Sequence, residues 1–232
     1  MSLKILSSHA VMEAMNELAP AFERASGQIL SFSYDPANVL KQRINAGEGF
    51  DIVILSRQVF DELAGQGKLL ADTGVDVGRS GLGVSARHGA PKLDIATVES
   101  FKRTLLAAKS IVRSKDGTSG IYFEQLLQRL GIGDAMRDKV ILGPSGRVAV
   151  LVAKAEVDLA VQQICELLPV KGANFVGPFP ADLQLYTVFT AGIAAASRQR
   201  SEAKAFIDSF TTPAAVARFQ AKGLEPIPHN AQ

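Results

Sequence analysis

The stretch "NVLKQRINAGEGFDIVILSRQVFDELAGQG" (residues 38–67) decides the fold class of this chain. Its centre, "FDIVIL" (50–55), is almost continuously apolar, which is typical of a parallel strand that is buried on both faces. Helical spacing of apolar residues predicts a helix on each side of it, over 38–47 and 57–67. A strand enclosed by two helices indicates an α/β architecture with a mostly parallel sheet.

The same alternation of short apolar strands and helical patterns extends outward along the chain. Toward the N-terminus, strands are predicted over 4–8 and 28–34, with a helix over 12–27 between them. Toward the C-terminus, a glycine-rich segment with one short strand (78–91) interrupts the alternation, which then resumes. A long apolar strand (183–194) and two helical patterns close the chain. We therefore expect two α/β units, each a mostly parallel sheet flanked by helices.

Composition and charge exclude several classes of partner. The chain has 232 residues and a net charge of +2, so it lacks the strong field expected of a protein that binds nucleic acid or an anionic membrane. Tryptophan is absent and aromatic residues make up 6% of the chain, which argues against sites built on base or sugar stacking. No apolar run approaches the length of about 18 residues that a membrane span needs.

The residue types that usually carry catalysis or metal binding form no pattern. The single cysteine, Cys165, excludes a disulfide within the chain and a cysteine-based metal site. The three histidines, His9, His88 and His229, are scattered without the spacing of metal ligands. The stretch "GTSGI" (117–121) does not match the nucleophile elbow of hydrolases. We therefore predict no catalytic residue, no metal and no cofactor, and expect that the protein is not an enzyme.

Small, hydroxyl and amide residues follow several predicted strands, where open α/β sheets bind their ligands. In "SKDGTSGIYFEQLLQRLG" (114–131), five such residues stand directly before a helix. They are either a simple helix cap or the N–H-rich mouth of an anion site. Recurrence of the arrangement after other strands favours the anion. The candidate ligand-binding residues are Ser7, Ser8, His9, Ala10, Tyr34, Ala37, Asn38, Ser56, Thr118, Ser119, Gly120, Gly146, Arg147, Gln162 and Gln163, with Pro144 and Ser145 in the same turns.

Longer segments resemble a known family along nearly the whole chain. The most specific are "INAGEGFDIVI" (44–54) and "TSGIY" (118–122). Others are "AMNELAPAFERASG" (14–27), "GRVAVLVAKAEVDLAV" (146–161) and "AKAFIDSFTTPAAVARFQAKGLEPI" (203–227). With these segments the chain resembles type II periplasmic solute-binding proteins, and among them the molybdate-binding proteins of ABC importers.

The resemblance implies a two-lobed fold with a ligand in the hinged cleft between the lobes. Lobe I would contain residues 1–82 and 186–232, and lobe II residues 83–185. It also implies a periplasmic monomer that hands a small anion to a membrane permease. No secretory signal is visible at the start of the sequence, so a cytoplasmic location stays open.

The residues expected to hold molybdate differ from the family pattern. The resemblance implies serines after the first two strands, backbone N–H groups in later turns, and a tyrosine after the last strand of lobe II. The matching positions here are Ala10, Ala37, Thr118–Ser119, Gly146 and Gln163. Each unmade hydrogen bond to a charged group costs ~1.5–3 kcal/mol, so we expect weaker molybdate binding than is usual for the family. Arg147 would suit a carboxylate or phosphate better.

Three functions are therefore compatible with the sequence. The first is the solute-binding component of an ABC-type importer that binds a molybdate-like oxyanion or a small organic or phosphate anion. The second is a cytoplasmic ligand-sensing domain of the same fold, although no DNA-binding helix-turn-helix is recognisable. An enzyme ranks third, because no nucleophile and base can be paired.

Overall fold

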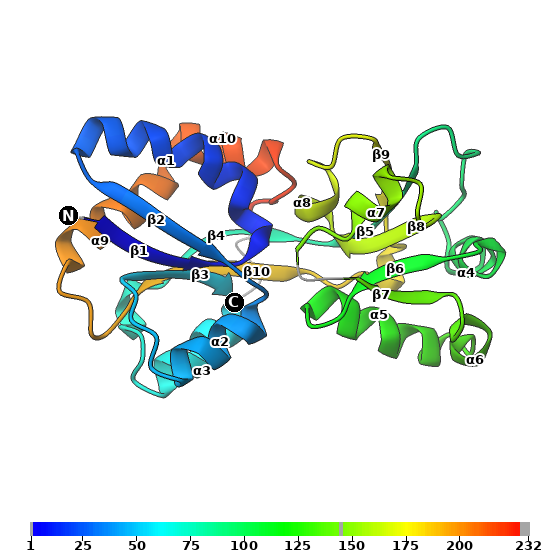
Figure 1. The fold of residues 1–232 in the computed structure, drawn as a ribbon, viewed down its shortest axis with the longest axis horizontal. Coiled ribbons are helices and arrows are strands. Elements are labelled where there is room, and N and C mark those ends of the chain that lie inside the picture. Colours follow the sequence, from blue (N-terminus) through cyan, green and yellow to red (C-terminus); the bar gives the residue numbers. More distant parts are fainter. Residues whose placement is uncertain (1, 144–145, 228–232) are drawn as a thin grey trace. The chain divides into compact units, whose positions relative to one another are not determined.

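The computed structural model describes residues 2–143 and 146–227. Pro144, Ser145 and His229 lie outside the described residues. The chain divides into two compact units, the first formed by Met1–Ser80 and Thr187–Gln232 and the second by Gly81–Tyr186 (Figure 1). The boundaries predicted from sequence lie one or two residues away, and Leu82 opens a strand of the second unit.

The first unit contains a five-stranded sheet in the order β2-β1-β3-β10-β4. β1 runs parallel to β2 and β3, whereas β10 runs antiparallel to β3 and β4. The strands are β1 (Ser2–Ser7), β2 (Ile29–Tyr34), β3 (Ile52–Ser56), β4 (Val75–Ser80) and β10 (Thr187–Ile193).

Helices cover both faces of this sheet, with α1 and α10 on one side and α2 and α3 on the other (Figure 1). All five residues of β3 are buried. Val53 and Leu55 of β3 pack with Leu40 of α2 and Leu63 of α3 in one core cluster, so the strand is enclosed as its apolar run predicts. The helices are α1 (Met12–Ser26), α2 (Ala37–Asn45), α3 (Arg57–Gly65), α9 (Arg200–Asp208) and α10 (Pro213–Ala221), with short 3-10 turns at His9–Val11, Ala71–Thr73 and Ser209–Thr211.

The second unit repeats this arrangement with the strand order β7-β6-β8-β5-β9. β6 is parallel to β7 and β8, and β5 is antiparallel to β8 and β9. Its strands are β5 (Leu82–Arg87), β6 (Ile111–Ser114), β7 (Val140–Gly143), β8 (Leu159–Gln163) and β9 (Ala173–Pro178). Its helices are α4 (Val98–Ala107), α5 (Thr118–Arg129), α6 (Gly133–Met136), α7 (Ala149–Ala153) and α8 (Ile164–Leu167), with a 3-10 turn at Ala181–Leu183.

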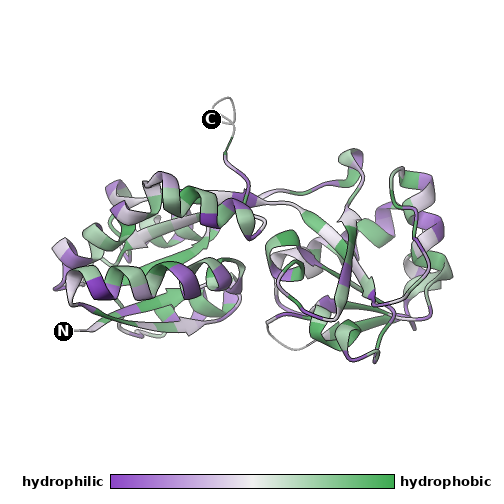
Figure 2. Ribbon diagram, turned by 90° about the horizontal axis from the view of Figure 1, so that it is seen from above, coloured by the Kyte–Doolittle hydropathy of each residue, from purple (hydrophilic) through white to green (hydrophobic). Residues whose placement is uncertain are grey.

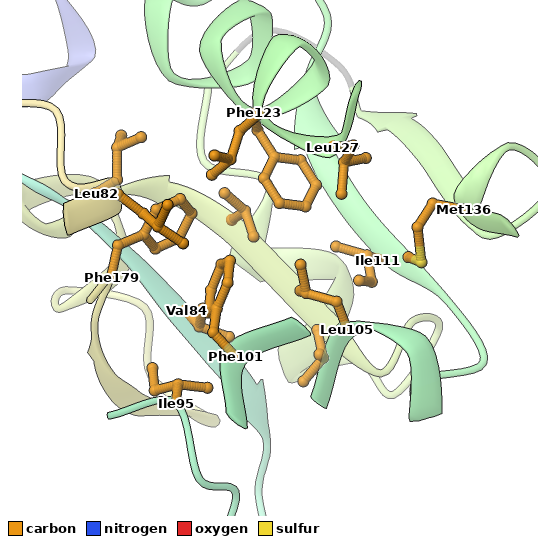
Figure 3. Close-up of a cluster of buried hydrophobic side chains, with 14 of the residues drawn as sticks. Leu82, Val84, Ile95, Phe101, Leu105, Ile111, Phe123, Leu127, Met136 and Phe179 are labelled. Atoms are coloured by element: carbon orange, nitrogen blue, oxygen red, sulfur yellow. The ribbon is translucent and has the colours of Figure 1, made fainter. Parts of the chain in front are cut away.

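An apolar core joins α4, α5 and the sheet of the second unit (Figure 3). Phe179 lies between Phe101 of α4 and Phe123 of α5, with ring centroids 4.7 and 6.2 Å away. The helices of both units carry hydrophilic and hydrophobic residues side by side (Figure 2), as expected of helices with one buried face. None of the helices within residues 2–143 and 146–227 has the length and apolar composition that a membrane span requires.

The predicted α/β class is confirmed, and individual elements need correction. The segment 78–91, for which one strand was expected, contains the end of β4 and all of β5. Asp76 and the positive φ of Gly78 interrupt the apolar pattern of β4, which explains why this strand was not predicted. β9 was missed too, and the predicted strand over 183–194 begins only at Thr187.

Candidate ligand-binding site

Three strands of the first unit end together at one edge of their sheet. Ser7, the last residue of β1, pairs with Tyr34 of β2 and Ile54 of β3. The backbone N–H of Ser8 donates to the Ile54 carbonyl (2.7 Å), and that of Asp35 donates to the Ser7 carbonyl (3.1 Å). These bonds join the turns that follow the strands. They bring together Ser7, Ser8, His9, Ala10, Tyr34, Ala37, Asn38 and Ser56.

The two serines of the β1 turn differ in what they can offer a ligand. The Ser7 hydroxyl donates to the Ser8 carbonyl (3.1 Å) and is fully buried. The Ser8 hydroxyl accepts the Ala10 N–H (3.2 Å), so its own proton can be donated elsewhere. Ala10, at the first position where the resemblance implies a serine, supplies no hydroxyl. Ser8 is therefore the better donor in this turn.

Aromatic rings surround this turn on the β2 side. The Tyr34 ring stacks on Phe32, with centroids 5.5 Å apart and planes 3° apart. The His9 ring lies 6.1 Å from the Tyr34 ring. The structure thus brings His9 and Tyr34 together, as their positions after adjacent strands suggest. Both present polar atoms at the end of an apolar body.

The second unit has an equivalent edge at the carboxyl ends of β6, β7 and β8. Ser114 of β6 pairs with Gly143 of β7, and its neighbour Arg113 pairs with Val161 of β8. The remaining candidates lie around this edge: Thr118, Ser119 and Gly120 begin α5, Gly146 and Arg147 lie between β7 and α7, and Gln162 and Gln163 are the last two residues of β8 instead of following it, as the sequence had suggested.

Helix α5 begins in direct contact with the last residue of β6. A Cβ atom placed on Gly120 would lie 1.8 Å from the Ser114 carbonyl oxygen, so only glycine fits there. The N–H groups of Gly117 and Gly120 are used locally, the first by the Ser114 hydroxyl (3.0 Å) and the second by the Gly117 carbonyl (3.0 Å). In a helix the preceding N–H groups have no intrahelical acceptor. Thr118 and Ser119 therefore offer the backbone N–H donors of this turn. Gly120 instead allows α5 to pack closely against Ser114 of β6.

The Gln162 side chain binds the protein backbone, whereas a ligand-binding role was expected for it. Its side-chain amide donates to the Gly146 carbonyl (2.8 Å) and accepts the Val148 N–H (3.1 Å). It thereby fixes the turn that carries Gly146 and Arg147 to the end of β8. Local sequence gives no sign of this role, because the partners lie 14 and 16 residues away.

Three helices that follow these edges, α2, α3 and α5, have the same kind of N-terminus. For α2, α3 and α5, no side chain of a described residue caps the helix, and the first turn contains no acidic residue. Helix α4 differs, since Thr97 and Ser100 form a capping box and Glu99 lies in its first turn. An uncapped N-terminus without acidic residues keeps its N–H groups and partial positive charge for an external anion.

One acidic residue lies close to the second edge and was missed from sequence. Glu166 lies in α8, directly after β8. Burial raises the pKa of its carboxyl to about 8, although the positive charge of Arg147 acts in the opposite direction. The carboxyl is thus mostly protonated at neutral pH. A single acid inside the apolar segment "ICELLP" (164–169) was the available signal.

The described part of the chain holds no group of three or more His, Cys, Asp or Glu side chains that could bind a metal ion. Cys165 is buried, and as the single cysteine it forms no disulfide within the chain. The two edges therefore offer hydroxyl, amide and backbone N–H donors, with Arg147 as the cation among the candidate residues.

Two five-stranded α/β sheets with open carboxyl edges define the fold of the type II periplasmic binding proteins. The structure of the periplasmic molybdate-binding protein of Azotobacter vinelandii shares this fold, with a TM-score of 0.82 at 18% identity over 96% of this chain and 98% of that one. Within this class, the chain belongs to the bacterial extracellular solute-binding protein family, whose model matches residues 3–225. The resemblance noted from the sequence is confirmed.

Two relatives cover nearly the whole chain. An aconitate isomerase of a Pseudomonas species is 31% identical over 98% of this chain and 88% of its own length. A putative ABC transporter substrate-binding lipoprotein of Bacillus subtilis, YvgL, is 23% identical over 96% of this chain and 86% of its own. Because one relative is named as an enzyme, the expectation that this chain has no enzymatic activity stays a prediction.

Proposed function

We propose that this protein is the solute-binding component of an ABC-type importer and binds a small anion at the carboxyl edges of its two sheets. The observation that carries the proposal is the set of three helix N-termini, on α2, α3 and α5, without a side-chain cap or an acid in the first turn. Such termini bind anions through backbone N–H groups and the helix dipole. The expected partner is a membrane permease, and the expected location is the periplasm, with the protein a monomer.

A small organic or phosphate anion suits these edges better than molybdate. Alanine stands at positions 10 and 37, and glutamine at 163, where the resemblance to molybdate-binding proteins implies hydroxyl donors to the oxyanion. The Ser7 hydroxyl is already engaged with the Ser8 carbonyl and does not replace them. Arg147 adds a donor set whose planar geometry matches carboxylate and phosphate. A relative named for a tricarboxylate substrate supports the same choice.

A panel of thermal-shift measurements tests the proposal. Phosphate, sulfate, molybdate, citrate and trans-aconitate are compared with glucose, glutamine and adenosine. At a concentration of 100 times its Kd, a ligand stabilises the folded state by about 2.7 kcal/mol, which melting curves resolve. We expect shifts only with anions, and larger ones with organic anions or phosphate than with molybdate. Shifts restricted to the neutral compounds would refute the proposal.

A second candidate function is isomerisation of an unsaturated carboxylate. It is favoured by the 31% identity to an aconitate isomerase over 98% of the chain. Allylic isomerisation moves one proton between two carbons and shifts the double bond, so it needs a group that takes up and returns a proton. Glu166 lies directly after β8 at the second edge, and burial raises its pKa to about 8, so its carboxyl is the candidate group for this proton transfer.

Incubation of the protein with trans-aconitate, followed by chromatographic separation of the cis and trans isomers, tests this second candidate. Conversion of trans-aconitate to the cis isomer by the parent protein, and its loss in Glu166→Gln, would support the isomerase function. If the anion binds but its isomer ratio does not change over hours, the protein only binds its ligand.

A further inference from the structure

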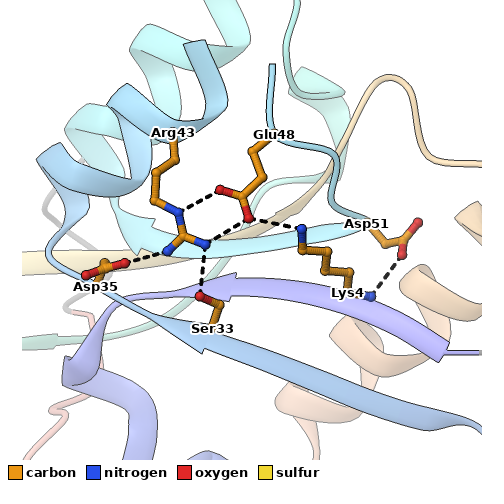
Figure 4. A network of polar contacts seen from close by, with 6 residues as sticks. All are labelled: Lys4, Ser33, Asp35, Arg43, Glu48 and Asp51. Carbon is orange, nitrogen blue, oxygen red and sulfur yellow. Dashed lines mark hydrogen bonds and ion pairs between the residues drawn. The ribbon is translucent and has the colours of Figure 1, made fainter. Parts of the chain in front are cut away.

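Arg43 of helix α2 is the centre of a polar network beside the carboxyl edge of the first unit (Figure 4). Its guanidinium donates to both carboxylate oxygens of Glu48 (2.7 and 2.8 Å) and to the Ser33 hydroxyl (2.9 Å). It also forms an ion pair with the Asp35 carboxylate. We call these four residues, Ser33, Asp35, Arg43 and Glu48, the Arg43 clamp.

The Arg43 clamp joins the segment before helix α2 to the segment after it. Ser33 and Asp35 precede the helix, and Glu48 follows it, so one guanidinium joins both ends of the connection. Lys4 of β1 donates to Glu48 as well (3.0 Å), which ties the clamp to the sheet. The bond from the Asp35 N–H to the Ser7 carbonyl fixes the other side of the turn. The start of α2, with Ala37 and Asn38, is thereby held against the strand ends.

The clamp also determines the charge at this turn. Asp35 stands two residues before Ala37, the first residue of the uncapped helix α2. A lone carboxylate at this place would oppose an incoming anion, since two like charges a few ångströms apart repel strongly near a protein surface. Arg43 pairs with that carboxylate as well as with Glu48, and Lys4 pairs with Glu48 in turn, so the two positive side chains balance the charges of Asp35 and Glu48. The side chains of Arg43, Asp35 and Glu48 are all about three-quarters buried, at 26, 29 and 26% exposure, so solvent screens them only in part.

We propose that Arg43 is a positioning residue for anion binding: it fixes the turn between β2 and α2 and neutralises Asp35 so that the helix N-terminus attracts an anion. This inference rests on the proposed function. It predicts that replacing Arg43 lowers the affinity for the anion because the Asp35 carboxylate, no longer paired, repels that anion. Removing the Asp35 charge should then restore binding.

The test compares Arg43→Gln, Asp35→Asn and the double variant with the parent protein. Lys41→Gln is the matched control, because Lys41 lies on the same helix and its ion pair with Glu62 (2.8 Å) does not involve the turn. Binding of phosphate, molybdate and trans-aconitate is measured by titration calorimetry at low and high salt. Hydrogen–deuterium exchange of residues 34–40 is measured without any anion.

For the anion that the parent binds best, we expect Arg43→Gln to weaken binding about tenfold at low salt. Adding Asp35→Asn should bring affinity back to within about threefold of the parent, and high salt should shrink the defect of the single variant. Lys41→Gln should bind like the parent. Exchange at residues 34–40 should be faster in Arg43→Gln than in Lys41→Gln.

Unchanged affinity in Arg43→Gln would overturn the inference. A defect that the double variant retains in full and that salt leaves unchanged would overturn it too, since it would reflect damage to the fold alone. If the parent binds none of the anions of the thermal-shift panel, the proposed function fails. The exchange measurement then still shows whether the clamp orders the turn, so the two failures are distinguishable.

Discussion

Replacement of Gly120 by alanine is the substitution to which the second edge should be most sensitive. The new Cβ would lie 1.8 Å from the Ser114 carbonyl oxygen and 2.8 Å from its carbonyl carbon, and both are backbone atoms that cannot rotate away. A carbon–oxygen contact normally needs about 3.3 Å, so α5 would have to move about 1.5 Å from β6. Forced displacement of this kind in a packed interior costs about 1–3 kcal/mol, and occasionally more.

Urea unfolding of Gly120→Ala and the parent measures this cost. The matched control is Gly65→Ala at the end of α3, where a Cβ has no atom within 4 Å. The control should be neutral or stabilised by about 0.4–1 kcal/mol. Because α5 carries the Thr118 and Ser119 donors, Gly120→Ala should also lose anion affinity. If Gly120→Ala unfolds at the same urea concentration as the parent, the close contact between α5 and β6 is wrong.

Two further predictions concern the Thr97 cap of α4 and the Glu166 carboxyl of α8. Thr97→Ala should lower the unfolding free energy by about 0.5–2 kcal/mol without affecting anion affinity, because it removes the cap of α4 only; chemical denaturation and calorimetry check both parts. For Glu166, the folded pKa of about 8 exceeds the unfolded value of 4.5, so the folded state binds more protons and the stability of the parent should fall as pH rises from 4.5 to 8. Glu166→Gln should abolish this decline, which amounts to at most about 1.4 kcal/mol per pH unit; parallel declines in both proteins would contradict it.

Sequence patterns were sufficient for the elements that obey a simple period. The apolar run at 50–55 predicted a strand enclosed on both faces, and β3 is buried throughout. Gly27 predicted the end of the first helix, and it caps α1 with a left-handed φ of 72°. β4 escaped prediction because it combines two charged residues, Asp76 and Arg79, with a glycine of unusual φ at the edge of the sheet, so its sequence shows no strand period.

At the carboxyl edges of the sheets, the sequence predicts where a side chain lies but not which groups it contacts. Residues after parallel strands gather at one edge of the sheet, and the structure places Ser8 directly after β1, Tyr34 at the end of β2 and Thr118 at the start of α5. Their contacts depend on segments distant in sequence. Gln162 faces a backbone turn 14 to 16 residues upstream, and the pKa of Glu166 depends on how deeply the fold buries it. Neither property has a local signature.

The proposed function requires that an anion binds at the uncapped start of α5. Backbone amide NMR signals, followed while phosphate or trans-aconitate is added, test it most directly. We expect the signals of Thr118 and Ser119 to shift until the site is saturated, while those of Glu99 and Ser100, at the capped start of α4, stay in place. Unmoved signals at Thr118 and Ser119 in the presence of a bound anion, or shifts of equal size at α4, would contradict it.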